Sequence, residues 1–170
     1  MTATRQVRLR EGYEPGAVGR IVELHGRYYA RAWGAGAPFE ILMARDVSDF
    51  LERYDPAFDL LVTAHLGEAM IGSLAVVGRT PRPGFAQIRF VIVDAAARRR
   101  GAGKAMLSRA LSWCRERGFA GVFLWTVDHL PESRSMYEKA GFLVVERCPD
   151  ARYTVPRDNL RMELTLADPA

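Results

Sequence analysis

Residues 91–104 read VIVDAAARRRGAGK, a segment with three parts of different physical character. An apolar run ends a strand predicted over 85–93, a short basic loop follows, and an amphipathic stretch predicts a helix over 103–117. The first N–H groups of a helix have no partner within it, and the helix dipole adds partial positive charge there. Glycines at 101 and 103 let a phosphate approach the backbone closely, because no Cβ intervenes. Together with the basic side chains, this predicts a site for a pyrophosphate.

Two common phosphate-binding loops do not match this segment. A Walker A loop needs glycine where Arg98 stands and Ser or Thr where Ala105 stands. A dinucleotide-binding fingerprint needs a third glycine where Met106 stands. The pattern that remains is Arg-x-x-Gly-x-Gly over residues 98–103.

Hydrophobic periodicity and turn residues predict alternating helices and strands on both sides of this segment. Strands are predicted over 6–10, 59–65, 69–78, 85–93, 121–127, 142–147 and 160–166, and helices over 16–32, 39–54, 103–117 and 131–140. No repeat or long linker divides the 170 residues, so one domain over 1–170 is expected. The order β-αα-β-β-β-α-β-α-β-β predicts an α/β fold, in which a mixed sheet carries helices on both faces.

Composition sets limits on location and cofactors. Apolar residues make up 49% of the chain, yet no run of about 18 of them exists for a membrane helix. Residues 1–10 hold three arginines and no apolar stretch, which argues against a secretory signal. The two cysteines, Cys114 and Cys148, do not form a metal-ligand spacing, so no metal site is expected. A reduced, cytoplasmic protein is the simplest interpretation.

The net charge of +4, from 24 basic and 20 acidic residues, has two explanations. A basic protein can bind nucleic acid. However, Arg98, Arg99, Arg100 and Lys104 alone carry four positive charges, so a local anion site accounts for the whole excess. No helix-turn-helix or aromatic-rich RNA motif accompanies the charge, and a local site is therefore favoured over nucleic acid.

The segment 98–103 resembles the (Gln/Arg)-x-x-Gly-x-(Gly/Ala) coenzyme A loop of the GNAT acetyltransferase superfamily. Its context strengthens the resemblance, because residues 123–126 (FLWT) and 136–142 (MYEKAGF) are similar to the family's penultimate strand and Leu-Tyr-x-x-x-Gly-Phe helix end. Residues 25–29, 39–40, 86–89 and 124–126 also resemble the acetyltransferase half of bacterial MarR–GNAT fusion proteins. The winged-helix half would have to precede residue 1.

The resemblance implies a single GNAT-like domain, with a mostly antiparallel sheet, that moves an acetyl group from acetyl-CoA directly to a primary amine. In this family a splayed strand, here the one ending at Val93, leaves a gap for the cofactor, and its backbone polarises the acetyl carbonyl. Tyr137 is the implied general acid for the departing thiolate. The implied cofactor-binding residues are Val91, Ile92, Val93, Arg98, Arg99, Arg100, Gly101, Ala102, Gly103 and Lys104.

The general base is less well defined by the sequence. Glu40, at the start of the second predicted helix, is the candidate, with His25 and His65 as alternatives. The family's usual asparagine seven residues before the tyrosine is Leu130 here, which removes one polar contact at this edge of the site. Arg89 lies within an apolar strand, so it either pairs with a carboxylate across the sheet or faces the acceptor cleft.

Two other functions use the same residues. A non-catalytic acyl-CoA-binding or regulatory module would need the basic loop but not Tyr137. A nucleic-acid-binding domain would use Arg98 to Arg100 and would show steep salt dependence. The acceptor is left open between a small molecule and a protein lysine, and a homodimer is left open as well.

Overall fold

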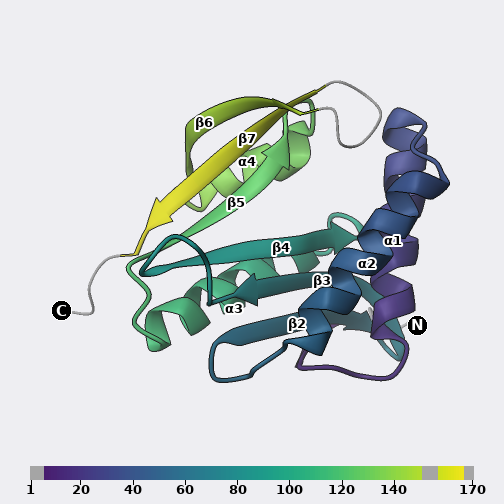
Figure 1. Ribbon diagram of the computed structural model, residues 1–170. Helices are drawn as coiled ribbons and strands as arrows, with labels where there is room; N and C mark the ends of the chain where they lie inside the picture. The colour runs from purple at the N-terminus through teal and green to yellow at the C-terminus, as the bar shows by residue number, and fades with distance from the viewer. Residues whose placement is uncertain (1–5, 151–156, 167–170) are drawn as a thin grey trace.

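A computed structural model describes residues 6–150 and 157–166 (Figure 1). Its elements follow the predicted order, with one added 3-10 turn, η1, in the basic segment. The strands are β1 (Val7–Glu11), β2 (Asp59–Leu66), β3 (Ala69–Val77), β4 (Phe85–Val93), β5 (Gly121–Val127), β6 (Leu143–Asp150) and β7 (Arg157–Thr165). The helices are α1 (Ala17–Trp33), α2 (Ala37–Glu52), η1 (Ala95–Ala97), α3 (Ala102–Glu116) and α4 (Pro131–Lys139).

The strands form one sheet in the order β1-β2-β3-β4-β5-β7-β6. Only β4 and β5 run parallel, so the predicted mixed and mostly antiparallel sheet is confirmed. Helices α1 and α2 cover one face and α3 and α4 the other (Figure 1). Because both faces of the central strands are covered, β2 and β3 are buried along almost their whole length.

Strands β4 and β5 pair only at their beginnings. Residues 85–88 are in register with 121–124, and beyond Ile88 the two strands have no ladder between them. They lie together at one end and diverge toward the other, with the turn between α1 and α2 beside the open end (Figure 1). This divergence is the splay implied by the family resemblance.

A β-bulge in β4 causes the divergence. Opposite β3, the register jumps from Ser73↔Ile92 to Ala75↔Arg89, so two residues of β4 face one of β3. Phe90 in this bulge has φ of 53°, a left-handed value that is uncommon for a residue with a Cβ. The buried Ser73 hydroxyl donates a 2.7 Å hydrogen bond to the Phe90 carbonyl and thereby holds the bulge.

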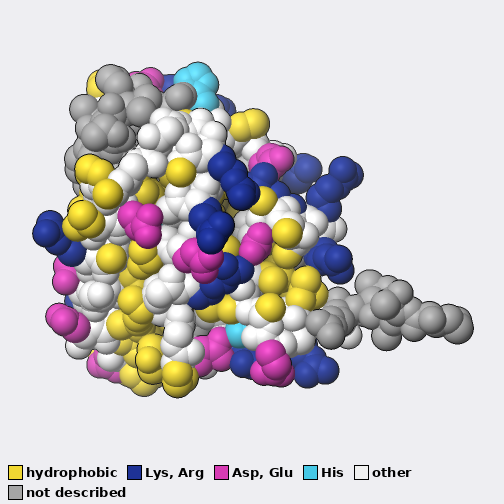
Figure 2. All heavy atoms as spheres, turned by 90° about the vertical axis from the view of Figure 1, so that its right-hand side faces the viewer, with side chains coloured by type: hydrophobic (Ala, Val, Ile, Leu, Met, Phe, Trp, Pro, Cys, Tyr) yellow, Lys and Arg dark blue, Asp and Glu magenta, His cyan; other side chains and the backbone are white. Residues whose placement is uncertain are grey.

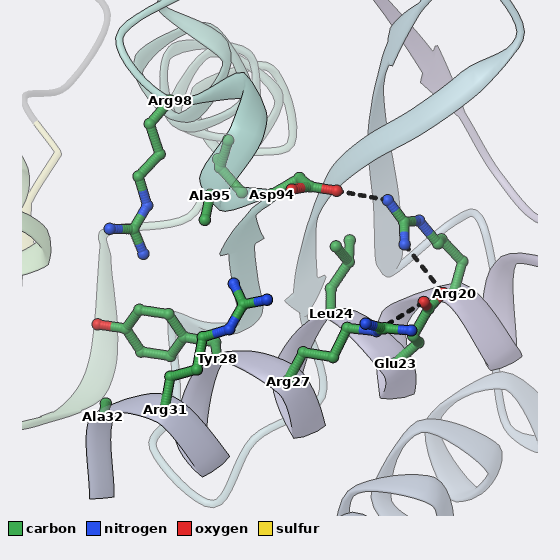
Figure 3. Close-up of a pocket in the computed structure, with 11 residues that line it drawn as sticks. Arg20, Glu23, Leu24, Arg27, Tyr28, Arg31, Ala32, Asp94, Ala95 and Arg98 are labelled. Carbon is green, nitrogen blue, oxygen red and sulfur yellow. Dashed lines mark hydrogen bonds and ion pairs between the residues drawn. The ribbon is translucent and has the colours of Figure 1, made fainter.

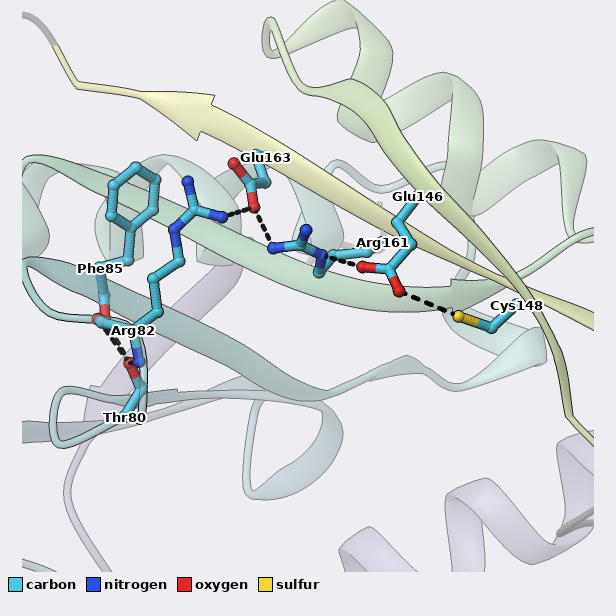
Figure 4. Close-up of polar contacts among 7 residues, drawn as sticks. All are labelled: Thr80, Arg82, Phe85, Glu146, Cys148, Arg161 and Glu163. Carbon is cyan, nitrogen blue, oxygen red and sulfur yellow. Dashed lines mark hydrogen bonds and ion pairs between the residues drawn. The ribbon is translucent and has the colours of Figure 1, made fainter.

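Polar side chains connect the start of β4 to β7 and β6 across the surface of β5 (Figure 4). Arg82, in the turn before β4, lies over the Phe85 ring at 4.0 Å and contacts Glu163 of β7. Glu163 also accepts from Arg161, which donates to Glu146 of β6 at 2.8 Å. The chain of contacts spans β5, and so it connects the start of β4 to the far edge of the sheet.

The element boundaries differ from the predicted ones mainly at the C-terminal hairpin. Strand β6 continues to Asp150 and β7 begins at Arg157, so Cys148 lies within a strand and not just past one. The added pairs, such as Cys148↔Asn159, extend the hairpin by backbone hydrogen bonding through polar residues that carry no apolar alternation. No helix in the described part of the chain is long and apolar enough to cross a membrane.

Candidate active site

A cleft of about 430 Å³ lies where β4 and β5 part. Six elements contribute to it: α1, α2 and β4 form one wall, and β5, α4 and β7 form the other. Its lining residues are His25, Tyr29, Trp33, Phe39, Met43, Asp46, Gln87, Ile88, Arg89, Phe90, Val91, Leu124, Trp125, Thr126, Val127, Leu130, Ser133, Tyr137 and Asn159.

The open edge of β4 supplies backbone groups to this region. Ile92 and Val93 pair with β3 on one side, and β5 has no register with them on the other. Ile92 is buried, while Val91 and Val93 are half-buried, so the three side chains also pack. Polar backbone groups that lack a strand partner bind a ligand or water instead.

Tyr137 reaches the cleft from α4. Its side chain is 4% exposed, and its ring packs edge-on against Phe142 with the centroids 5.8 Å apart. Burial raises the pKa of the phenol above its ordinary value, because the charged phenolate is poorly solvated there. The hydroxyl is therefore a proton or hydrogen-bond donor at neutral pH.

The start of α3 has the geometry of an anion site. Gly101 precedes the helix with φ of 78°, and no side chain caps the first turn. The N–H groups of Ala102 and its successors therefore lack the partner that a capping side chain would give them. Arg99 has φ of 64°, and neither it nor Lys104 forms an ion pair with a described residue.

A second hollow, of about 420 Å³, lies between α1 and the segment that leads into α3 (Figure 3). Its lining includes four arginines and two carboxylates, so its net charge is positive. Arg31 and Arg98 extend into it from opposite walls, and Arg98 lies over the Tyr28 ring at 5.1 Å. Arg98 also contacts Glu132 of α4 at 3.3 Å. Viewed from this side, Lys and Arg gather near the centre of the surface, with acidic side chains among them (Figure 2).

Arg20 ties α1 to the end of β4 in this hollow. It donates to Asp94 at 2.7 Å, to Glu23 at 2.9 Å and to the Met70 carbonyl at 2.9 Å. The Ala96 N–H donates to the Asp94 carboxylate and, with Arg20, holds its pKa below the usual range. Arg20, Arg27 and Arg31 recur at seven- and four-residue spacing, which puts them on one helix face and could have been recognised in the sequence.

Glu40 and Tyr137 are not brought together. The Glu40 carboxylate lies beside Gly26 of α1, and Glu40 is not among the residues that line the cleft. The carboxylate in the cleft is that of Asp46, which shares a helix face with Phe39 and Met43 at i, i+4 and i+7. Glu40, one residue after Phe39, is turned about 100° away.

Arg89 faces the cleft, as one of the two predicted alternatives has it, and its carboxylate partner is not across the sheet. Its guanidinium donates to Asp46 at 2.9 Å and lies over the Phe90 ring at 4.7 Å. Both members of the ion pair line the cleft, and their side chains are 27% and 32% exposed. The partner lies on α2 and not across the sheet.

The two buried histidines have different surroundings. His25 lines the cleft, and its Nδ1–H donates to the Ile21 carbonyl at 2.8 Å, so Nε2 carries the lone pair. Burial lowers its pKa to about 4, and the ring is neutral at pH 7. His65 lies apart from the cleft, with Nε2 2.8 Å from Glu14 and 2.9 Å from the Thr63 hydroxyl. Within residues 6–150 and 157–166 no group of His, Cys, Asp or Glu could hold a metal ion.

The family model described as the acetyltransferase (GNAT) family matches residues 19–142, which include the splayed strand, the basic loop and Tyr137. The chain belongs to the GNAT acetyltransferase family. The family resemblance carried by residues 98–103 is thus confirmed. The narrower likeness to MarR–GNAT fusions stays a prediction.

Individual GNAT proteins agree with this assignment. Mycothiol acetyltransferase from Beutenbergia cavernae is 31% identical over 103 residues, which are 61% of this chain and 33% of the relative. The chain therefore spans about a third of the length of this curated relative. A GCN5-related N-acetyltransferase from Kribbella flavida has a TM-score of 0.76 and 20% identity, with 96% and 100% of the two chains covered. The structure of yncA from Salmonella typhimurium, with its cofactor acetyl-CoA, has a TM-score of 0.74 and 16% identity, with 96% of each chain covered.

Proposed function

We propose that this GNAT protein transfers the acetyl group of acetyl-CoA directly to a primary amine, without an acyl-enzyme intermediate. The observation that carries the proposal is one cleft that both the unpaired edge of β4 and Tyr137 line. The two cysteines do not line this cleft, which leaves no thiol to carry the acetyl group there. Neither cysteine forms a disulfide with the other, which also agrees with a reducing, cytoplasmic setting.

The residues present fit acetyl-CoA, which supplies a thioester as the acetyl donor. The uncapped start of α3 would hold the pyrophosphate through backbone N–H groups at Gly101 to Lys104, with Arg98, Arg99 and Arg100 around it. The arginines of the second hollow add positive charge beside this loop. The backbone at Val91 to Val93 would hold the pantetheine arm and polarise the acetyl carbonyl.

Tyr137 would donate its proton to the departing thiolate. Reference pKa values are about 8.5 for a thiol and about 10 for a phenol, so full transfer is uphill by roughly 1.5 units. Burial raises the Tyr137 pKa further, which favours hydrogen-bond donation to the thiolate until solvent supplies the proton. A positioned acid of this kind typically contributes about 10²–10⁴-fold to the rate.

The acceptor must arrive with, or acquire, a neutral amine. An ammonium with pKa about 10.4 is deprotonated in roughly one molecule in a thousand near neutral pH, which costs about 4 kcal/mol. Two groups in the cleft can accept from it: the Asp46 carboxylate and the Nε2 lone pair of His25. We therefore assign the base to the Asp46 and His25 side of the cleft, in place of Glu40.

A thermal-shift titration with acetyl-CoA tests the cofactor site on the wild type and two variants. Gly101→Trp puts an indole at the start of α3, and Gly118→Trp is the matched control just beyond the other end of that helix. Both glycines have positive φ, 78° and 75°, and no atom within 4 Å of an added Cβ, so the strain of substitution is the same. Binding at 100 times the dissociation constant should stabilise the native state by about 2.7 kcal/mol. We expect this shift in wild type and Gly118→Trp, and its loss in Gly101→Trp; no shift in wild type at millimolar cofactor would contradict the proposal.

A further inference from the structure

The walls of the cleft indicate the class of acceptor, an inference that rests on the proposed function. On the α1 and α2 side the cleft has an aromatic surface made of Tyr29, Trp33 and Phe39. The Tyr29 ring centroid lies 4.6 Å from Trp33 and 4.8 Å from Phe39, and Met43 continues the apolar surface. Trp125, 41% exposed, faces the cleft from β5. An acceptor with a flat or bulky apolar group would bury that group here.

The charges in the cleft are few and opposite. Among the described residues, 6–150 and 157–166, Asp46 is the only carboxylate and Arg89 the only guanidinium that line the cleft, and His25 is neutral at pH 7. A described lining with zero net charge does not match a polycation, which would need several carboxylates, nor a polyanion. It does match a molecule that carries one charge of each sign.

The Asp46–Arg89 contact has unused capacity. One N–H of the guanidinium donates to one carboxylate oxygen at 2.9 Å, while a guanidinium has five N–H donors and a carboxylate accepts on both oxygens. Both side chains are about a third exposed, so a ligand can reach them. A zwitterion whose two charges are close together can therefore bind beside the ion pair, with its negative group facing Arg89 and its positive group facing Asp46.

We propose that the acceptor is a free α-amino acid with an aromatic or large apolar side chain. Its carboxylate would bind Arg89 and its ammonium would bind Asp46, while the side chain packs on Tyr29, Trp33 and Phe39. Arg89 is two residues before Val91 on β4, so their Cα atoms lie within about 7 Å of each other, and the proposed carboxylate partner stands on the open strand edge itself. The cleft volume of about 430 Å³ is in the range of small-molecule sites.

The reaction balances with this acceptor. An N–C bond forms between the amine and the acetyl carbonyl carbon, and the C–S bond of the thioester breaks. Of the two protons that leave the ammonium nitrogen, one passes to solvent by way of Asp46 and the other ends on the coenzyme A thiol. Tyr137, on the opposite wall, is the hydrogen-bond donor to that sulfur.

Intrinsic fluorescence provides a test that does not need turnover. Two of the three tryptophans, Trp33 and Trp125, line the cleft. The protein with coenzyme A would be titrated with L-phenylalanine, L-phenylalaninamide, which lacks the carboxylate, and 3-phenylpropionate, which lacks the amine. We expect L-phenylalanine to bind at least tenfold more tightly than either analogue. Free-thiol release from acetyl-CoA should follow the same preference between the two amines, and L-lysine and L-glutamate should be poorer acceptors.

Variants assign the preference to the ion pair. Arg89→Gln should remove the tenfold preference for L-phenylalanine over the amide, because only the amino acid has a carboxylate for Arg89 to bind. Arg45→Gln is the control, because Arg45 is an exposed residue of α2 that does not line the cleft; it should retain the preference. Equal binding of amino acid and amide, or no binding of any of the three, would overturn the acceptor class and leave the proposed function standing if the acetyl-CoA thermal shift is present. Loss of that shift in wild type would overturn the proposed function itself.

Discussion

The hydroxyl of Ser73 is expected to hold the open geometry of β4, and Ser73→Ala tests this. The side chain is fully buried on β3, and its 2.7 Å hydrogen bond to the Phe90 carbonyl is directed at the bulge. Phe90 stands at φ of 53°, a conformation that costs on the order of 1–3 kcal/mol and persists only when its surroundings enforce it. Removing the hydroxyl takes away one of those constraints.

The magnitude follows from the hydrogen bond. A buried hydrogen bond contributes about 1 kcal/mol net, and a carbonyl left without its donor costs about 1–3 kcal/mol. We expect Ser73→Ala to lower the free energy of unfolding by about 1–3 kcal/mol, which corresponds to roughly 2–4 °C per kcal/mol in a chain of this size. Because the bulge sets the spacing of the β4 edge, acetyl-CoA affinity should fall by about tenfold, equivalent to 1.4 kcal/mol.

Urea unfolding and calorimetric titration with acetyl-CoA measure the two effects separately, at a temperature where the variant is folded. Ser108→Ala, on the exposed face of α3, is the control and should change stability by less than about 0.5 kcal/mol. Unchanged stability and unchanged affinity in Ser73→Ala would refute the reasoning. Lower stability with unchanged affinity would show that the hydroxyl supports packing but does not position the cofactor edge.

Three further predictions concern other parts of the molecule. The pKa of His25 is lowered from 6.5 to about 4, so between those values the unfolded chain binds a proton that the folded chain does not. Wild type should therefore lose about 2 kcal/mol of stability from this residue between pH 7.5 and pH 5. Urea unfolding of His25→Gln at both pH values should not show this loss. Burial raises the pKa of the Cys114 thiol to about 12, so a thiol reagent should modify Cys148 alone in the native protein and both cysteines in guanidinium. Native protein modified at Cys148 should retain acetyl transfer. An added Cβ at Gly78 would lie 2.0 Å from the Phe58 carbonyl oxygen, so Gly78→Ala should destabilise by about 2 kcal/mol or more, whereas Gly19→Ala, in an open position on α1, should stabilise by about 0.5–1 kcal/mol in the same unfolding assay.

The basic loop and its flanking elements could be predicted from the sequence because the signals there are local. Strand β4 was placed at its observed bounds from its apolar composition, and α3 within one residue of them from its periodicity. The bulge at Phe90 could not be predicted, since it depends on register with β3 and on the hydroxyl of Ser73, 17 residues away. Local sequence patterns do not predict such a long-range pairing, and the residue type phenylalanine does not predict a positive φ.

The general base is a different case. Glu40 is predicted from its place at the start of the second predicted helix, and in the structure its carboxylate lies beside Gly26 and outside the cleft lining. Asp46 follows the apolar residues Phe39 and Met43 by seven and three positions, so helical spacing places its side chain on the same face as theirs. A carboxylate that continues an apolar stripe faces the interior, and its partner, Arg89, was itself singled out for lying in an apolar strand. A charged residue at an apolar position of α2 and another at an apolar position of β4 thus each indicate that a partner of opposite charge lies opposite.

The two sides of the cleft differ in whether backbone groups or side chains face the ligand. In the proposed complex, backbone groups of β4 and the start of α3 would hold acetyl-CoA, and most side-chain substitutions there leave the N–H groups in place. The proposed acceptor would meet side chains on two helical stripes, at i, i+4 and i+8 on α1 and at i, i+4 and i+7 on α2: His25, Tyr29, Trp33, Phe39, Met43 and Asp46. These stripes lie outside the backbone proposed to hold the cofactor, so substitutions in them would change the acceptor without changing the donor. On this proposal, the charge and shape of that helical wall, and not the coenzyme A loop, would determine which amine is acetylated.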